Sequence, residues 1–369
     1  MTAAVLDDGA STLRLLRVPT PVPRAGEALV RVAACGVCHT DLHVIRGEVA
    51  FPRPAVLGHE ISGTIVALGD GTAAPAGLGI GTEVVAGFIM PCGSCAQCRR
   101  GRDDMCVEFF AQNRLRGTLY DGRSRLTMPD GSFLAMYSMG GLAEYCVVPL
   151  TAVAPAPAGV DLAAAAILGC AGLTSYGAVF RAGQVEPGST VAVVGAGGIG
   201  GAVIRMAVAA GASRIVAVDI AADKLDQAGR LGATDLVDAT ASDAVAQVRA
   251  LTGGVDVAFE ALGRPETFGQ ASRMLADGGR MVAIGIAAGD AAASIEITPL
   301  VRRGHTIVGS FGGRTRTDLP EVVGIAERGG FDPEPMVTRR VPLAEAPGIY
   351  EALGRGEIVG RAIVEMGVG

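Results

Sequence analysis

The segment between residues 190 and 219 constrains the fold more than any other part of this chain. A β-branched run at 190–194 leads into the glycine motif GAGGIG at 195–200, which matches the pattern G-x-G-x-x-G. Apolar residues at helical spacing follow, and a second strand-like run ends in Asp219. This order predicts a βαβ unit that binds a dinucleotide, because the glycines let the backbone approach a pyrophosphate at the N-terminus of the helix.

The glycine motif assigns roles to particular residues. The pyrophosphate of the coenzyme is expected against Gly195, Gly197, Gly198, Ile199 and Gly200. Asp219 would accept hydrogen bonds from the adenosine ribose hydroxyls, and its charge would repel a 2′-phosphate, so the sequence favours NAD⁺ over NADP⁺. The competing interpretation is an ordinary glycine turn followed by a solvated aspartate.

Further strand-like runs follow at 233–237, 255–259, 280–284 and 305–310. Because these runs alternate with helical stretches, they predict an α/β fold with a parallel, doubly wound sheet. The apolar stretch 190–211 is long enough to resemble a membrane span. It contains the glycine cluster and Arg205, however, so a strand, a tight turn and a buried helix explain it better.

Bulk composition sets outer limits on function. A chain of 369 residues suggests two domains, and 50% hydrophobic with 18% charged residues is enough for a large core. The net charge of −6 provides no general attraction for nucleic acid. The N-terminus lacks a basic head followed by an apolar core, so the sequence predicts no signal peptide, no membrane partner and a cytoplasmic protein.

Half of the eight cysteines lie in one short stretch, PCGSCAQCRRGRDDMC, at Cys92, Cys95, Cys98 and Cys106. Four thiolates hold Zn²⁺ tetrahedrally and leave no open position, so the stretch predicts a structural zinc. A disulfide framework suits small secreted chains better. A ferredoxin-like cluster would close its fourth cysteine after three residues and follow it with proline, whereas here the gap is seven and Val107 follows.

A second set of soft ligands is spread along the chain. Three of the four histidines lie between residues 39 and 59, and Cys38, His59 and Cys170 together would give Zn²⁺ three protein ligands and one open position. From the residues alone, Cys170 could equally be plain core. Core packing is the expectation for three others, which are Cys35, Cys146 and His305.

The chain resembles the zinc-dependent medium-chain alcohol dehydrogenases over nearly its whole length. The resemblance rests on GVCHTDLH, GHE, the four-cysteine loop, LGCAGLTSYGA, VVGAGGIG and a closing GRAIVEM. It implies a GroES-like, mainly β catalytic domain at 1–171 and 311–369, with the structural-zinc loop at 92–106. A Rossmann coenzyme domain at 172–310 would lie between these parts in sequence.

The resemblance also implies roles for individual residues. Cys38, His59 and Cys170 would bind the catalytic zinc, and the four-cysteine loop would bind a second zinc. Thr40 would touch the substrate oxygen, His43 would end the proton relay at solvent, and Asp41 would orient His59. Glu60 would approach the metal during ligand exchange. The remaining positions assigned this way are Phe88 in the substrate pocket and His39, Lys224, Ile284 and Arg361 at the coenzyme.

These roles imply a hydride transfer between an alcohol and NAD⁺, with the proton leaving through Thr40, the nicotinamide ribose and His43. Cys170 stands where polyol dehydrogenases of the family commonly have glutamate, so the alcohol branch is favoured. The competing enzyme is a thiol-adduct formaldehyde dehydrogenase. The glutathione-dependent members typically place an acidic residue near Val49 and an arginine near Phe110, and these two positions themselves carry neither charge.

Three further expectations remain. Another low-molecular-weight thiol could use arginines of the segment 107–141 as anion contacts, although solvated side chains in a loop are the simpler interpretation of Arg114, Arg116, Arg123 and Arg125. The length of that segment resembles the insert of dimeric relatives, which implies a homodimer formed through the coenzyme domains. A non-catalytic protein of the same fold is the remaining alternative, and the complete set of site residues argues against it.

Overall fold

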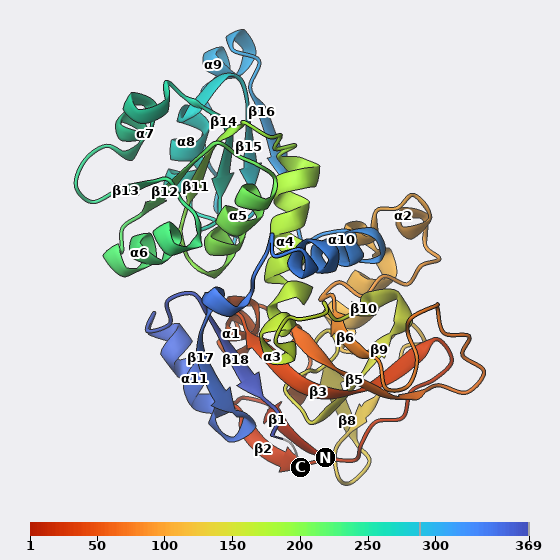
Figure 1. Ribbon diagram of the computed structural model, residues 1–369. Helices are drawn as coiled ribbons and strands as arrows, with labels where there is room; N and C mark the ends of the chain where they lie inside the picture. Colours follow the sequence, from red (N-terminus) through yellow and green to blue (C-terminus); the bar gives the residue numbers. More distant parts are fainter. Residues whose placement is uncertain (288, 368–369) are drawn as a thin grey trace. The chain divides into compact units, whose positions relative to one another are not determined.

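The computed structural model describes residues 1–287 and 289–367 (Figure 1). Its contacts divide the chain into two compact units. The first unit consists of Met1–Leu173, Arg314–Glu327 and the chain from Val337 onward. The second consists of Thr174–Gly313 and Arg328–Met336.

The second unit is built on a six-stranded parallel sheet, which confirms the predicted doubly wound fold (Figure 1). Its strands, in spatial order, are β13 (Asp235–Asp238), β12 (Arg214–Asp219), β11 (Thr190–Val194), β14 (Val255–Glu260), β15 (Leu275–Ala283) and β16 (Thr306–Gly309). The order reverses between β11 and β14, and in such sheets ligands bind beyond the carboxyl ends of the strands at this point.

Helices pack on both faces of this sheet, because alternate residues of β11 face opposite ways. Val193 faces α5 (Gly198–Ala209), which packs beside α6 (Ala222–Leu231) (Figure 1). Ala192 and Val194 belong to the core cluster that also holds buried residues of α7 (Ala244–Thr252) and α8 (Pro265–Arg273). The other helices of the unit are η5 (Gly177–Ala182), α9 (Ile297–Arg302) and η6 (Glu334–Met336).

The first unit is mainly β. One sheet has the long strand β3 near its centre, with the order β10 (Val153–Pro155), β6 (Glu83–Ala86), β5 (Ile61–Leu68), β3 (Glu27–Val37), β18 (Arg361–Glu365) and β17 (Val337–Pro342). Strand β9 (Tyr145–Pro149) also pairs with β3. The other sheet has the order β2 (Arg14–Arg17), β1 (Thr2–Leu6), β4 (Ala55–Val56), β8 (Phe133–Met136) and β7 (Leu126–Thr127).

Short helices connect these strands. They are α1 (His39–Ile45), α2 (Ala96–Arg99), η1 (Asp103–Met105), η2 (Phe109–Arg114), η3 (Leu150–Ala152), α3 (Leu162–Ala165), η4 (Ala166–Gly169), α10 (Thr315–Glu327), η7 (Leu343–Glu345) and α11 (Ala346–Gly354). Helix α4 (Ala171–Tyr176) contains the first boundary between the two units. Buried Cys35 and Cys146 lie in β3 and β9, which confirms that both are core residues.

The expectation of a plain loop at 107–141 was wrong. This segment contains the π-helix η2 and the strands β7 and β8, which supply two strands of a sheet. Arg125 is not a solvated side chain, since it lies buried against Glu27 with a nitrogen–oxygen distance of 2.5 Å. Arg114 packs over the ring of Tyr137 at 4.0 Å from the centroid. The sequence concealed these elements because the segment has no clean apolar periodicity.

None of the single helices in the described part of the chain is long and apolar enough to cross a membrane. One bent pair, Leu162–Gly169 with Ala171–Ala182, passes on length and composition alone.

Candidate active site and metal centres

Cys38, His59 and Cys170 meet in the first unit although they are far apart in sequence. Cys38 follows β3 and is the N-cap residue of α1, His59 lies between β4 and β5, and Cys170 follows η4. Their ligand atoms, together with a carboxylate oxygen of Glu60, lie within 4.8 Å of one another. All four side chains are buried. The spacing in sequence could not show this convergence; the packing of the elements that flank these residues produces it.

The backbone around His59 explains part of the GHE motif. Gly58 has φ +95°, a conformation that side chains with a Cβ rarely adopt. A Cβ there would also lie 2.6 Å from the backbone nitrogen of Leu142. Glycine is therefore needed to turn the chain so that His59 points into the site.

The imidazole of His59 is held on one side and open on the other. Its Nδ1 lies 3.0 Å from Oδ1 of Asp41, and this carboxylate also accepts a hydrogen bond from the Gly58 N–H at 3.2 Å. Nε2 is buried and has no hydrogen-bond partner among the described residues. A buried nitrogen beside two thiols is a donor set that a soft divalent cation such as Zn²⁺ satisfies. The residues therefore fit a zinc ion, and the predicted place of Asp41 beside His59 is confirmed.

The pKa shifts of Cys38, His59 and Cys170 also fit a metal site. The hydrogen bond from Cys170 lowers the pKa of Cys38 well below its usual value, and the same contact raises the pKa of Cys170. Burial acts to lower the pKa of His59, but the charge and hydrogen bond of Asp41, together with Cys38, raise it to about 10. Without a metal, His59 and Cys170 thus retain protons that a cation would displace.

Glu60 and Arg361 form a buried ion pair beside these ligands. Nη2 of Arg361 donates to Oε1 of Glu60, and both side chains are almost fully buried. Burial raises the pKa of Glu60 while the charge of Arg361 opposes that shift. Oε1 of Glu60 lies 4.0 Å from Nε2 of His59. Arg361 thus neutralises a carboxylate next to the ligand group, and its predicted role at the coenzyme remains a prediction.

Helix α1 carries the residues predicted for proton transfer. The hydroxyl of Thr40 accepts a hydrogen bond from the Cys38 thiol at 3.5 Å, so it lies beside the ligand group. His43 lies on the same helix with about half of its side chain exposed, and it pairs with Glu48. His39 is exposed at the start of the helix. The roles of Thr40 and His43 in proton transfer remain predictions.

Two aromatic rings lie against the imidazole of His59. The buried ring of Phe88 meets it edge-on at 5.9 Å between centroids, and the buried ring of Tyr137 does so at 6.0 Å. Phe51 in turn packs on Tyr137 at 4.9 Å. Sequence reasoning identified Phe88 and missed Tyr137, because the latter lies in the segment that was expected to be a loop.

The four cysteines of the 92–106 loop form the second group of ligand atoms within 4.8 Å of one another. The sulfurs of Cys92 and Cys98 are 4.0 Å apart, far beyond the bond length of a disulfide, and all four thiols are free. Tetrahedral zinc thiolates at 2.3 Å would place sulfurs about 3.8 Å apart. The geometry rules out the disulfide alternative and fits a closed zinc site.

Backbone amides in this loop point at the sulfurs. The N–H groups of Cys92, Cys95 and Phe109 lie 3.2, 3.3 and 3.4 Å from sulfurs of the group. Burial acts to raise the pKa of Cys95, but amides from Cys98 and Val107 lower it to about 6. The amides thus favour thiolate charge at Cys95, whereas burial raises the pKa of Cys106 to about 11 and that of Cys98 well above its usual value.

An ion pair fixes the cysteine loop to helix α10. The side chain of Arg316 donates to the buried carboxylate of Asp103 at 2.6 and 3.0 Å, and its backbone N–H donates to the same carboxylate at 3.0 Å. It also donates to the carbonyl of Cys98 at 2.5 Å. No sequence signal identified this contact, since the partners are more than 200 positions apart.

In the second unit the glycine motif predicted to bind the coenzyme follows the carboxyl end of β11, and Asp219 ends the neighbouring strand β12. Gly200, in the first turn of α5, lets the helix lie close to the end of β11, because a Cβ at this position would lie 1.8 Å from the carbonyl oxygen of Gly195. The carboxylate of Asp219 accepts backbone hydrogen bonds from Ala196, Ile220 and Ala221 at 2.7, 2.8 and 3.1 Å. Asp219 therefore also holds the glycine turn itself, a role that the sequence did not indicate.

The two other predicted coenzyme positions of this unit are less constrained. Lys224 is half-buried in the first turn of α6, and Ile284 is half-buried just beyond β15. The backbone N–H of Ile284 donates to the carbonyl of Glu260 at 2.8 Å. Both stay predictions.

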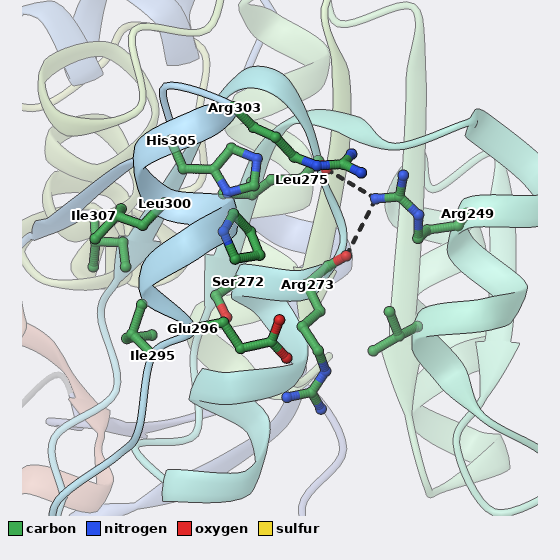
Figure 2. Close-up of a pocket in the computed structure, with 12 residues that line it drawn as sticks. Arg249, Ser272, Arg273, Leu275, Ile295, Glu296, Leu300, Arg303, His305 and Ile307 are labelled. Carbon is green, nitrogen blue, oxygen red and sulfur yellow. Dashed lines mark hydrogen bonds between the residues drawn. The ribbon is translucent and has the colours of Figure 1, made fainter.

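A cavity of about 290 Å³ lies at the opposite edge of the same sheet (Figure 2). It is lined at the amino ends of β15 and β16 by Leu275 and His305, and none of the predicted site residues lines it. Arg249 is held at its rim by the carbonyls of Arg273 and Leu275 at 3.3 and 2.9 Å. His305, expected to be core, is a half-buried wall of this cavity, and burial lowers its pKa.

A mainly β unit with two zinc-type ligand groups, together with a doubly wound dinucleotide-binding sheet, defines the class of zinc-binding dehydrogenases. Comparison with known proteins agrees. Residues 24–158 match the model of the alcohol dehydrogenase GroES-like domain, and residues 198–328 match that of the zinc-binding dehydrogenases. The chain belongs to the zinc-dependent medium-chain alcohol dehydrogenase family.

Individual relatives are similar over their full length. A probable S-(hydroxymethyl)glutathione dehydrogenase of Schizosaccharomyces pombe is 35% identical, covering 99% of this chain and 96% of the relative. An alcohol dehydrogenase zinc-binding domain protein from Burkholderia ambifaria is 32% identical with a TM-score of 0.91, covering 100% and 99%. Benzyl alcohol dehydrogenase from Acinetobacter calcoaceticus is 31% identical with a TM-score of 0.90, covering 99% of each chain.

Proposed function

We propose that this oxidoreductase transfers a hydride between a primary or secondary alcohol and NAD⁺, giving the aldehyde or ketone, and that it catalyses the reverse reduction. The observation that carries the proposal is the convergence of two thiols and an imidazole whose buried Nε2 has no partner among the described residues. A closed structural site would need a fourth strong ligand. Here the fourth group is the carboxylate of Glu60, whose Oε1 is engaged by Arg361 and whose Oε2 has no partner among the described residues.

We assign two zinc ions to each subunit, one to Cys38, His59 and Cys170 and one to the four-cysteine loop. A zinc ion held by the first group would supply Lewis acidity toward a substrate oxygen. The protein's part is to orient the ligands. Asp41 fixes the ring of His59 and holds its proton on Nδ1, so that Nε2 is left as the donor nitrogen.

Thr40 and His43 would carry the proton of the alcohol. The hydroxyl of Thr40 is adjacent to the thiol of Cys38, so it can accept a proton from a substrate hydroxyl held at the ligand group. His43 is half-exposed and can exchange protons with water, and its Nδ1 pairs with the carboxylate of Glu48. The buried rings of Phe88 and Tyr137 keep water from the side of His59 that they cover.

NAD⁺ would supply the hydride acceptor, and we assign its binding to the second unit. The glycine motif at the end of β11 lets the pyrophosphate approach the backbone, and the carboxylate of Asp219 disfavours a 2′-phosphate. His39, Lys224, Ile284 and Arg361 are the further proposed coenzyme residues. In this proposal the first unit is the catalytic domain and the second the coenzyme domain.

An alcohol substrate is supported over a glutathione adduct. One relative is a probable S-(hydroxymethyl)glutathione dehydrogenase, but Val49 and Phe110 stand where a glutathione site would need charged residues. The ring cluster of Phe51, Phe88 and Tyr137 beside His59 favours an apolar or aromatic alcohol instead.

Two further parts of the proposal concern the whole protein. Strand β16 is an edge strand, and Ile297 and Val301 near it are about three-quarters exposed, which supports a homodimer formed through this unit. The eight cysteines are all unpaired, which supports a reducing, cytoplasmic location.

Metal analysis and an NADH absorbance assay with a panel of aliphatic, aromatic and terpenoid alcohols test the proposal. We expect two zinc ions per subunit and activity with NAD⁺ well above that with NADP⁺. The His43→Gln variant should lose turnover mainly at low pH and recover in part with added buffer base. A holoprotein with at most one zinc, or a zinc-replete protein that oxidises none of these alcohols, would contradict the proposal.

A further inference from the structure

We infer that Tyr350 is a positioning residue for the ligand group of Cys38, His59 and Cys170, and that it acts through Asp41. The inference rests on the proposed function, since it concerns how the proposed metal ligands are oriented. It begins from a chain of buried hydrogen bonds that connects the C-terminal helix α11 to the imidazole of His59.

The chain has three members. The phenol of Tyr350 donates to Oδ2 of Asp41 at 2.9 Å. The other oxygen of this carboxylate, Oδ1, accepts from Nδ1 of His59 at 3.0 Å and from the Gly58 N–H at 3.2 Å. Tyr350 is 2% exposed, and Asp41 and His59 are not exposed at all. Water therefore has no access to the two carboxylate oxygens, and the protein supplies every donor shown.

The direction of the first bond follows from the chemistry of the partners. An ionised carboxylate only accepts, so the phenol must donate. Burial raises the pKa of Tyr350 well above its usual value, and the charge of Asp41 adds to that effect, so the phenol keeps its proton. Tyr350 thus donates to one oxygen of Asp41, while the other oxygen accepts from Nδ1 of His59.

The two oxygens of Asp41 have different tasks. Oδ1 contacts the imidazole, whereas Oδ2 contacts only Tyr350 among the hydrogen bonds of the described residues. Without the phenol, Oδ2 would be a buried acceptor with no donor, and the carboxylate could rotate away from its present plane. The imidazole of His59 would follow, because its orientation depends on the Nδ1 contact. A hydrogen bond two steps from the ligands therefore sets the direction of Nε2.

Helix α11 fixes the place of the phenol. This helix packs against α1, which carries Asp41, and buries Ile349, Tyr350 and Leu353. On its outer side Tyr350 lines a surface cavity of about 320 Å³, together with Leu42 and Glu351. The phenol ring therefore separates this cavity from Asp41. A small residue at 350 would let water reach the carboxylate and replace the missing donor, so phenylalanine is the informative substitution.

Tyr350→Phe removes the donor and keeps the ring. We expect its affinity for zinc at this ligand group to fall about tenfold, the range seen when a residue that orients a metal-bound histidine is lost. Competition with a chromophoric chelator measures the affinity, with the four-cysteine site kept loaded. With cobalt in place of zinc, the visible absorption bands should shift. Leu353→Ala is the matched control, because it removes buried side chain from the same helix without touching Asp41. It should lower thermal stability and leave both metal readouts unchanged.

A double-mutant cycle separates a positioning role from a merely structural one. If Tyr350 acts through Asp41, then Tyr350→Phe should have little further effect on zinc affinity in an Asp41→Asn background. Independent, additive losses would overturn the inference, and so would a folded Tyr350→Phe protein with the zinc affinity and cobalt spectrum of the wild type.

A measurement on the wild-type sequence covers the case in which Tyr350→Phe does not fold. With fluorotyrosine at all five tyrosines, removing zinc should move the fluorine resonance of Tyr350 and leave that of Tyr145 unmoved. An unmoved Tyr350 resonance would refute the inference. If the wild type itself failed to bind zinc or oxidise alcohols, the proposed function would fail; if only the Tyr350 readouts failed, the inference alone would.

Discussion

The ion pair between Arg316 and Asp103 offers the clearest quantitative prediction. In Arg316→Met the carboxylate of Asp103, which is 1% exposed, loses its guanidinium partner and keeps only the backbone N–H of residue 316. Removing one partner of a fully buried pair costs about 3–5 kcal/mol. Since the guanidinium is one-third exposed, we expect the lower end, about 3 kcal/mol. For a unit of roughly 200 residues this lowers Tm by about 6–12 °C.

The measurement is thermal unfolding by circular dichroism or calorimetry, because the chain contains no tryptophan for fluorescence. A natural control lies two residues away. Arg314 approaches Asp104 only to 4.0 Å and is more exposed, so Arg314→Met should cost less than about 1 kcal/mol. Adding Asp103→Asn to Arg316→Met should restore most of the loss, since the unpaired charge is gone.

The same substitution should loosen the cysteine loop. Arg316 also holds the carbonyl of Cys98, so its loss should speed zinc release from the four-cysteine site to a chelator. Equal Tm values for Arg316→Met and Arg314→Met would refute the reasoning, because the argument depends on burial of Asp103 and not on charge alone.

Three further predictions concern the two sites. Cys170→Ser should remove one zinc per subunit and abolish turnover, while Cys146→Ala, an equally buried thiol outside the ligand group, should keep both; metal analysis with a turnover assay decides. Gly200→Ala should lower the free energy of unfolding by about 1–3 kcal/mol, because the added Cβ would lie 1.8 Å from the carbonyl oxygen of Gly195. Gly197→Ala is the control: an added Cβ there meets open space, so thermal unfolding should show wild-type stability. Zinc binding at the ligand group of Cys38, His59 and Cys170 should release about two protons near neutral pH, because the pKa of His59 is about 10 and that of Cys170 is raised. The zinc affinity should therefore fall as the pH falls. The test is calorimetry of zinc binding in buffers of different ionisation enthalpy, and identical heats in all buffers would contradict the prediction.

Local patterns in the sequence predicted the coenzyme half well. The strand at 190–194 and the glycine motif lie where expected, because strand and helix periodicity and glycine turns are local properties. The edges shifted by one or two residues at β13 and β16, as is usual at element ends, and β15 begins at Leu275, five residues before its predicted start. The segment 107–141 was misjudged, because β8 pairs with the distant strand β4, and the short strand β7 pairs with β8 alone.

Residue type and order by themselves determined the chemistry available to this protein. Thiols and an imidazole in a recognisable order indicated two zinc sites, and the glycines and Asp219 indicated a dinucleotide. Only the tertiary structure decided how that chemistry is held. It brought Tyr350 to Asp41 across 309 positions, placed Tyr137 against His59, and tied Arg316 to Asp103. Contacts of this kind leave no local signal, because they depend on which buried surfaces meet after folding and not on which residues are neighbours in the chain.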